Sequence, residues 1–147
     1  MKIIVDADAC PVKDEIRDLT LDKGIQVIFV AALSHQMPDM EGIQVKMVDN
    51  IPQAADMAII NATDPGDLVI TGDGGLASLV LARKAFALSF WGYPYSDSQI
   101  EGILNQRYWG QKIRRAGGRI RGPHPFHKDD RERFRTSLTR FIDRLNK

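Results

Sequence analysis

Two aspartates stand near the start of the chain, directly after a short apolar run. They are Asp6 and Asp8, within the stretch IIVDADACP at residues 3–11. Because side chains two residues apart on an extended chain point the same way, both carboxylates should face one spot. At a separation of about 4 to 5 Å, two carboxylates repel each other by roughly 3 to 4 kcal/mol at an effective dielectric constant near 20. A positive group is therefore expected close to them.

A hard divalent cation is the simplest positive group for such a place. Mg²⁺ or Mn²⁺ is typically held by one or two carboxylates together with water and substrate phosphates. Two later acids could join the first pair, namely Asp73 in LVITGDGG and Asp56 in QAADMAII. We therefore expect a weakly held Mg²⁺ or Mn²⁺ ion near Asp6, Asp8 and Asp73, with Asp56 as a further candidate ligand.

These acids also have a purely structural interpretation. Asp8 precedes Pro11 and could cap the helix that follows, which would leave Asp6 in a solvated turn. Asp56 could be an ordinary exposed acid on a helix. The sequence leaves both interpretations open.

The elements that must position the acids follow from the hydrophobic periodicity. Apolar runs typical of strands alternate with runs of helical spacing. We expect strands at residues 2–5, 26–31, 44–48, 67–71 and 87–90, and helices at residues 12–23, 51–62 and 76–84. The runs at 27–30 and 68–70 are apolar at successive positions, as expected of strands that helices cover on both faces. The sequence thus predicts an α/β three-layer sandwich with a mainly parallel five-stranded sheet.

Such a sheet predicts where the acids meet. In open parallel sheets, ligands bind beyond the carboxyl ends of the strands, where the strand order reverses. Asp6 and Asp8 end the first predicted strand, and Asp73 follows the fourth. If these two strands are neighbours, the three carboxylates share one rim of the sheet.

Composition indicates one ordinary globular domain. The chain has 147 residues, of which 44% are hydrophobic and 27% charged. No apolar run approaches the roughly 20 residues that a membrane span needs, and the start of the chain does not resemble a signal peptide. Cys10 is the only cysteine, so no disulfide can form within the chain, and we expect a cytoplasmic protein. We divide this domain, residues 1–147, into a body at 1–92 and a basic helical extension at 93–147.

Charge is distributed unevenly along the chain. Residues 1–106 contain 7 Lys and Arg against 15 Asp and Glu, whereas residues 107–147 contain 13 against 4. A basic segment on an acidic body is typical of a protein that binds RNA or another single-stranded nucleic acid, although the segment could simply neutralise its own body. The candidate phosphate-binding residues are Arg107, Lys112, Arg114, Arg115, Arg119 and Arg121.

Two helices are expected in the extension. Ser96 and Gln99 form a plausible capping box, from which a helix would run toward Arg115. Farther on, apolar residues recur at helical spacing and predict an amphipathic helix that docks on the body. They are Phe134, Leu138, Phe141, Ile142 and Leu145.

Other reactive side chains carry weaker signals. Cys10 lies close to two aspartates, which oppose a thiolate, so we expect a small buried side chain there. His124 and His127 lie in a proline-rich turn without a Cys or Glu at zinc spacing, and we interpret them as surface residues. The GDGG stretch lacks the Lys-Ser/Thr ending of a phosphate loop.

Several motifs resemble one family along nearly the whole chain. The stretches VDADACPVKDEI, QAADMAI, GDLVIT, GILNQR, RRAGG and DRERF are similar to those of the YaiI/YqxD family of uncharacterised bacterial proteins. Two stretches depart from the family pattern. The chain reads TGDGGLA where the family usually reads like TADIPLA, and Trp91 stands where an Arg before Gly is common.

The resemblance implies a fold and an activity. The YaiI/YqxD family is similar to PIN-like and NYN-like nuclease domains, which implies a PIN-like three-layer α/β fold and a metal-dependent ribonuclease-type site. On that pattern Asp6 and Asp8 match the first-strand pair, Asp56 the acid on a helix and Asp73 the acid after strand four. Metal ions would then promote phosphodiester hydrolysis. The basic stretch from Arg107 to Arg121 would hold the strand's backbone without reading its bases.

Two other functions remain open. A haloacid-dehalogenase-like phosphatase also begins with a strand that ends in Asp-x-Asp, although Cys10 stands where it usually has Thr or Val, and Ala77 where it has a further Asp. A catalytically inactive module that binds nucleic acid or protein would fit the same fold. Both enzyme folds place strand one beside strand four, so the helical connections must distinguish them.

Overall fold

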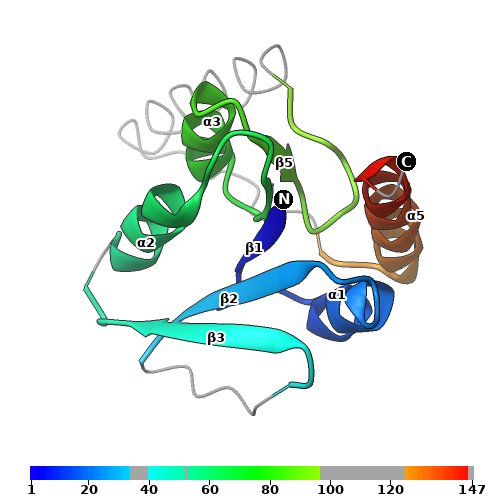
Figure 1. The fold of residues 1–147 in the computed structure, drawn as a ribbon, viewed down its shortest axis with the longest axis horizontal. Coiled ribbons are helices and arrows are strands. Elements are labelled where there is room, and N and C mark those ends of the chain that lie inside the picture. The colour runs from blue at the N-terminus through cyan, green and yellow to red at the C-terminus, as the bar shows by residue number, and fades with distance from the viewer. Residues whose placement is uncertain (34–39, 52, 97–124, 146–147) are drawn as a thin grey trace, which may run out of the picture.

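Five parallel strands form the centre of the protein, and four described helices pack around them (Figure 1). The computed structural model describes residues 1–33, 40–51, 53–96 and 125–145. The strands are β1 (Lys2–Asp6), β2 (Gln26–Ala32), β3 (Ile43–Val48), β4 (Leu68–Ile70) and β5 (Phe86–Leu88). The helices are α1 (Lys13–Thr20), α2 (Ala54–Ala62), α3 (Gly74–Ala82) and α5 (Lys128–Leu145). The expected strands and body helices are thus confirmed, with ends that differ by a few residues.

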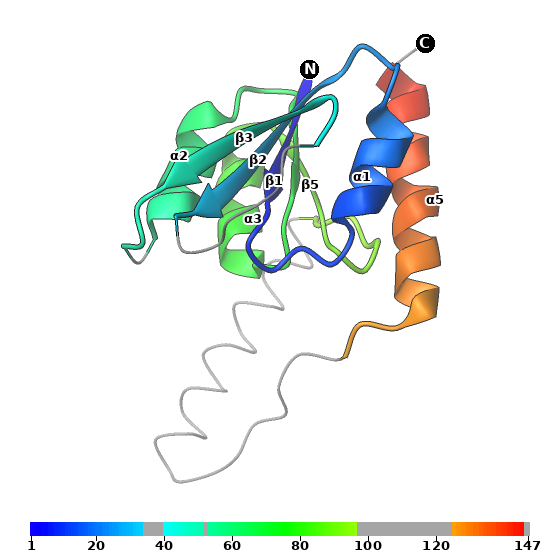
Figure 2. The same cartoon turned by 90° about the horizontal axis from the view of Figure 1, so that it is seen from below.

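The strand order is β3-β2-β1-β4-β5, so the strand order reverses at β1. All four strand pairs are parallel, and the carboxyl ends of the strands therefore meet at one edge of the sheet (Figure 2). Val5 of β1 lies opposite Ile70 of β4, which brings the residues that follow them, Asp6 and Thr71, side by side. In the opposite direction this order reads 5-4-1-2-3, and in either direction β1 lies beside β4, as it does in both candidate enzyme folds. Strand order therefore does not separate the nuclease from the phosphatase.

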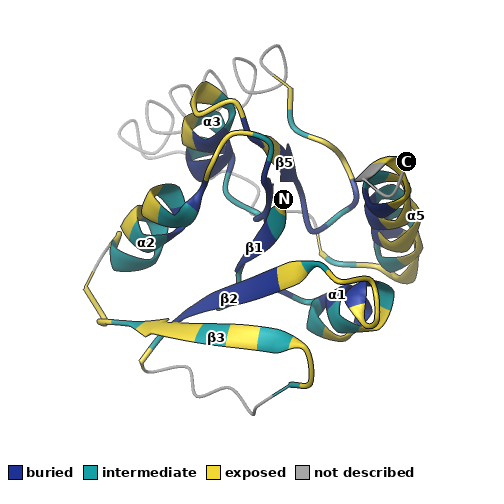
Figure 3. Cartoon of the chain, viewed as in Figure 1, coloured by how far each residue is buried: buried dark blue, intermediate teal, exposed yellow. Residues whose placement is uncertain are grey.

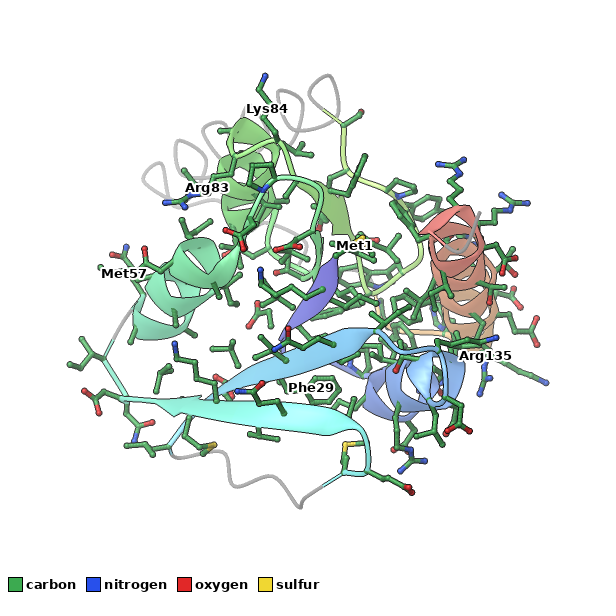
Figure 4. The ribbon with its side chains drawn as sticks, viewed as in Figure 1. Met1, Phe29, Met57, Arg83, Lys84 and Arg135 are labelled. Atoms are coloured by element: carbon green, nitrogen blue, oxygen red, sulfur yellow. The ribbon has the colours of Figure 1, made fainter. Side chains whose placement is uncertain are left out.

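Helices cover both faces of the sheet and make three layers. α1 and α5 lie together on one face, and α2 and α3 lie on the other (Figures 1 and 2). On the α1 face, Phe29 is completely buried and points from β2 toward α1 (Figure 4). On the opposite face, Ile28 and Val30 pack with Ile59 of α2 and Val80 of α3. β1, β2 and β4 are buried on both faces as the apolar runs predict, while the edge strand β3 is largely exposed (Figure 3).

The last helix completes the core on the α1 face. Phe134, Leu138 and Ile142 of α5 are buried at the spacing of an amphipathic helix, which confirms its expected docking on the body. The Glu15 carboxylate of α1 accepts a hydrogen bond of 2.6 Å from Arg131, and Arg135 lies at the same border between the two helices (Figure 4). α5 is therefore joined to the body by both apolar contacts and ion pairs.

Other expectations for the extension fall outside the described structure. Residues 97–124 contain the predicted helix toward Arg115, His124 and all six candidate phosphate-binding residues from Arg107 to Arg121. His127 is exposed, as expected of a surface residue. Among the described helices, none has the length and apolar character that crossing a bilayer requires.

Candidate functional site

Asp6 occupies the centre of the carboxyl edge, at the end of β1. Its Oδ2 accepts a hydrogen bond of 3.0 Å from the Thr71 hydroxyl, directly after β4. The same hydroxyl oxygen accepts a hydrogen bond of 3.0 Å from the backbone N–H of Asp73. Thr71 therefore links the Asp6 carboxylate to the backbone of the second acid, across the two central strands.

The surroundings of Asp6 disfavour a negative charge. Burial raises the pKa of the Asp6 carboxyl above its ordinary value, and the hydrogen bond from Thr71 partly opposes this rise. Asp56, Asp8 and Asp73 each raise the pKa further through charge repulsion. Three of the four acids singled out in the sequence thus act on the carboxylate of the fourth, Asp6. A cation placed here would favour the ionised form of Asp6, because opposite charge lowers a carboxyl pKa.

Asp73 has a structural role as well as a place in the site. Its Oδ1 accepts hydrogen bonds from the backbone N–H groups of Gly75 at 2.8 Å and Leu76 at 3.4 Å, so it caps the N-terminus of α3. A side-chain oxygen at this position satisfies N–H groups that have no partner within the helix. The cap fixes the Asp73 carboxylate beside Asp6, in one shared pocket.

Aromatic rings form the other wall of that pocket. We call it the Asp6 pocket; it has a volume of about 460 Å³. Its lining comprises Asp6, Asp73, Gly72, Ala9, Pro11, Phe90, Trp91 and Phe126. A Cβ on Gly72 would lie 2.9 Å from Cδ2 of Phe90 and 3.4 Å from Cζ3 of Trp91. Only glycine therefore lets these rings pack so closely against the backbone between Thr71 and Asp73.

Asp8 lies on a second pocket, together with Asp56. The Asp8 carboxylate accepts hydrogen bonds from the backbone N–H of Ala32, at 3.0 and 3.2 Å, at the end of β2. Asp8 and Asp56 line a pocket of about 380 Å³ that includes Asp49 and Asn50. The N-cap position of α1 is occupied by Val12, and no side-chain capping hydrogen bond is formed there. The interpretation of Asp8 as its N-cap is therefore wrong.

The four acids lie in two pairs, and neither pair alone fills the coordination sphere of a divalent cation. Within the described ranges, no group of three Asp, Glu, His or Cys side chains is placed to hold one metal ion. Asp6 and Asp73 share one pocket, whereas Asp8 and Asp56 share another. One or two carboxylates with water and substrate oxygens suffice for Mg²⁺. The Asp6 pocket fits that requirement, and a joint site of Asp6, Asp8 and Asp73 stays a prediction.

Cys10 is close to the acids but is not reactive. Its side chain is only 6% exposed, which confirms the expected small buried side chain. Burial raises the pKa of the thiol to about 12, and the Asp6 carboxylate adds to the rise. A thiol with this pKa carries almost no thiolate at neutral pH, so Cys10 is unsuited to nucleophilic attack.

Sequence reasoning missed Thr71 and the aromatic wall. Thr71 is completely buried, and its carbonyl accepts a hydrogen bond of 3.3 Å from the Tyr95 hydroxyl. The register of the two strands could have indicated Thr71, because Thr71 directly follows β4 at the level where Asp6 ends β1. Phe90 and Trp91 follow β5, whereas Phe126 precedes α5, so spacing alone could not place the three rings on one pocket.

Comparisons with known proteins cover nearly the whole chain. The model of a family described as "Uncharacterized BCR, YaiI/YqxD family" matches residues 4–144. A UPF0178 protein of Alkaliphilus metalliredigens is 41% identical over 144 residues, which are 98% of this chain and 93% of that protein. UPF0178 proteins of Enterococcus faecalis and Bacillus cereus are 40% and 42% identical over 146 residues, covering 98% of this chain and 99% and 100% of theirs. No solved structure matches the chain.

Proposed function

The chain belongs to the YaiI/YqxD family, and from the site at the carboxyl edge we propose that it is a metal-dependent nuclease that hydrolyses RNA phosphodiester bonds. One observation carries the proposal. The Asp6 carboxyl is half-buried where the strand order reverses, and three further carboxylates raise its pKa. Such a concentration of acids is unfavourable for a site without a cation, and favourable for one that binds a metal and a phosphate.

Asp6 and Asp73 would hold the metal in the Asp6 pocket. Asp8 and Asp56 would add negative potential from the second pocket. A bound Mg²⁺ or Mn²⁺ would supply an activated water and would stabilise the charge that develops on the phosphate.

The chain's own side chains prepare this site in three ways. Thr71 orients the Asp6 carboxylate through its hydroxyl, and the cap on α3 holds the Asp73 carboxylate in place. Trp91 and Phe126 line the same pocket and offer apolar surface to a nucleobase. Stacking on aromatic rings tolerates every base, so this wall suits cleavage without sequence preference. The basic segment from Arg107 to Arg121 would hold the backbone, as the charge distribution suggests.

A direct test measures cleavage of a 5′-labelled single-stranded RNA with Mn²⁺ and with a chelator. Asp6→Asn and Asp73→Asn should each slow Mn²⁺-dependent cleavage by about 10²-fold or more, because each removes a ligand of the metal that would stabilise the charge developing on the phosphate. Asp18→Asn removes an exposed acid on α1 and should leave the rate unchanged. Cleavage that persists in the Asp6→Asn variant would refute the proposal.

Calorimetry tests the metal separately from the reaction. Mn²⁺ should bind weakly to the wild type and more tightly when a phosphate-bearing ligand is present, since a site with few protein ligands keeps positions for substrate oxygens. The double variant Asp6→Asn, Asp73→Asn should lose this binding. Hydrolysis of a small phosphomonoester that Asp6→Asn abolishes, without RNA cleavage, would instead support the phosphatase. Salt-sensitive RNA binding without cleavage under any metal would support the binding module.

A further inference from the structure

A groove runs between α5 and the outer edge of β5, away from the acids. It has a volume of about 460 Å³ and is formed by one stripe of α5 facing Phe86 and the loop at residues 92–94. We call it the α5 groove. The stripe includes Arg133, Arg140, Phe141 and Arg144, which recur at the spacing of one helix face.

The charged side chains that line the α5 groove are positive. Among the described residues, three arginines line it and no acidic side chain does. Arg133 donates to Asp130 at 2.9 Å, so part of its charge is compensated. Arg140 and Arg144 are exposed and form no ion pair with any side chain in the described ranges. The neighbouring arginines Arg131 and Arg135 contact Glu15 instead. In the described structure, Arg140 and Arg144 therefore bring positive charge to the groove without an acidic partner.

Aromatic rings are exposed beside these arginines. Phe86 is 52% exposed, and its ring meets that of Phe141 edge to face at 5.9 Å between centroids. Tyr93 is 53% exposed, and the Arg133 guanidinium lies 4.5 Å from its ring centroid. A positive track with exposed aromatic rings is the arrangement that binds single-stranded nucleic acid, because arginines contact phosphates and rings stack on bases.

The loop joins the α5 groove to the Asp6 pocket. Trp91 lines the Asp6 pocket, while the next residue, Gly92, lines the groove. The loop is attached to α5 by two hydrogen bonds, from the Ser137 hydroxyl to the Gly92 carbonyl at 2.6 Å and from Arg133 to the Trp91 carbonyl at 3.2 Å. A strand leaving the Asp6 pocket would therefore reach the groove by crossing a loop held firmly against α5.

We propose that the α5 groove binds single-stranded RNA, with Arg140 and Arg144 on the phosphates and Phe86 stacked on a base. None of these residues belongs to the segment Arg107–Arg121 of the sequence. The direction of the strand, from the Asp6 pocket into the groove, rests on the nuclease activity proposed above. The occupancy of the groove by RNA does not, because it follows from the charge and the rings alone.

Binding is measured by fluorescence anisotropy with a labelled 12-nucleotide oligouridylate, in chelator and over a salt series. Arg140→Gln, Arg144→Gln should weaken binding, and the slope of log affinity against log salt should become less steep by about 1.4, at about 0.7 per phosphate contact on a single strand. Phe86→Leu should weaken binding about 5-fold or more without changing the slope, since stacking on a ring is worth roughly 1–3 kcal/mol per base.

A matched control removes the same charge elsewhere. Lys23→Gln, Lys46→Gln neutralises two exposed cations, one after α1 and one on β3, and should keep the affinity and slope of the wild type. Ultraviolet crosslinking of 4-thiouridine RNA to the wild type gives a measurement that does not depend on any variant folding. Crosslinked peptides should include residues 133–144 of α5.

The outcomes separate the groove from the nuclease. Groove-dependent binding without cleavage supports the groove and refutes the nuclease. Metal-dependent cleavage with equal affinity and slope in the groove variants and no crosslink at α5 refutes the groove alone. Displacement of the RNA by polyglutamate at equal charge concentration would also overturn the proposal, in favour of an acidic protein partner.

Discussion

The Thr71 hydroxyl donates a hydrogen bond of 3.0 Å to the Asp6 carboxylate and accepts one of 3.0 Å from the Asp73 backbone. Both partners of Thr71 belong to the candidate site, and Thr71 itself is completely buried. A residue of this kind controls the site without contacting a substrate. It positions the two acids and moderates the pKa of the first.

Replacement of Thr71 by Val should therefore change the pH profile as well as the stability. Removal of the hydroxyl raises the pKa of Asp6 further, so the acidic limb of the RNA cleavage profile should move to higher pH. The free energy of unfolding should fall by about 1–3 kcal/mol, because the Asp73 N–H is left without its acceptor. Thr71→Ser keeps the hydroxyl and should restore the profile. If Thr71→Val and Thr71→Ser have the same profile, the positioning role is wrong.

The raised pKa of Asp6 predicts how stability depends on pH. The folded protein holds the Asp6 proton more tightly than the unfolded chain, so this group's contribution to stability is lost as pH rises from the ordinary value through the raised one. At neutral pH, Asp6→Asn should therefore unfold at a higher temperature than the wild type. The difference should disappear below pH 3.8, where the wild-type carboxyl is protonated in both states. Equal melting temperatures of the two proteins at pH 7 would contradict this expectation.

Bound metal should reverse the order of stability of the wild type and Asp6→Asn. A ligand that binds only the folded state adds about 2.7 kcal/mol at 100 times its Kd. Mn²⁺ should therefore raise the melting temperature of the wild type and leave that of Asp6→Asn unchanged. The comparison is made by calorimetry at neutral pH, with Ca²⁺-free buffer and chelator as the reference. A rise of equal size in both proteins would place the metal elsewhere.

Cys10 should resist alkylation in the folded protein. Its burial and its pKa of about 12 leave almost no thiolate at pH 8, whereas unfolding exposes an ordinary thiol. Reaction with iodoacetamide, followed by mass spectrometry, should be slow in buffer and fast in denaturant. Rapid alkylation in buffer would show that the packing around Cys10 opens to solvent more readily than the structure indicates.

Gly92 should tolerate no side chain. It has φ of +88°, and a Cβ there would lie 2.6 Å from the backbone of Arg133 and Phe134. Gly92→Ala should therefore lower the free energy of unfolding by about 2 kcal/mol or more, from strain and steric overlap together. Gly66 has φ of +87° with no atom near its absent Cβ, so Gly66→Ala carries the backbone strain alone. Equal losses in the two variants, measured by urea unfolding, would contradict the close packing of the loop on α5.

Much of the fold followed from the sequence because its signals are local. β1, β2 and β4 are covered on both faces, so their apolar runs were unbroken and could be recognised. α5 kept its apolar stripe at helical spacing, since one face of it meets the core. The helix expected at 76–84 begins earlier, at Gly74, because the Asp73 carboxylate supplies a cap that offsets the low helix propensity of two glycines.

The site was harder to predict because it depends on contacts between distant segments. Parallel pairing of β1 with β4 brings Asp6 and Asp73 together, as expected from their places after two strands. Asp8 follows the same strand as Asp6, but its hydrogen bonds to Ala32 draw it toward β2 and into the other pocket. Residue spacing does not show whether a carboxylate will accept a hydrogen bond from a neighbouring backbone N–H or face the shared pocket. Spacing alone therefore could not separate Asp8 from Asp6.

The packing of α5 on α1 sets the order in which this protein can mature during synthesis. Phe134, Leu138 and Ile142 cover a face of the sheet that the first hundred residues have already built. Until α5 has emerged from the ribosome, that apolar face stays open to water and to other nascent chains. Glu15 likewise lacks its partner Arg131, which lies more than a hundred residues later in the chain. The body therefore reaches its final form only after α5 has been made, and a chain interrupted before α5 would be a substrate for chaperones and proteases.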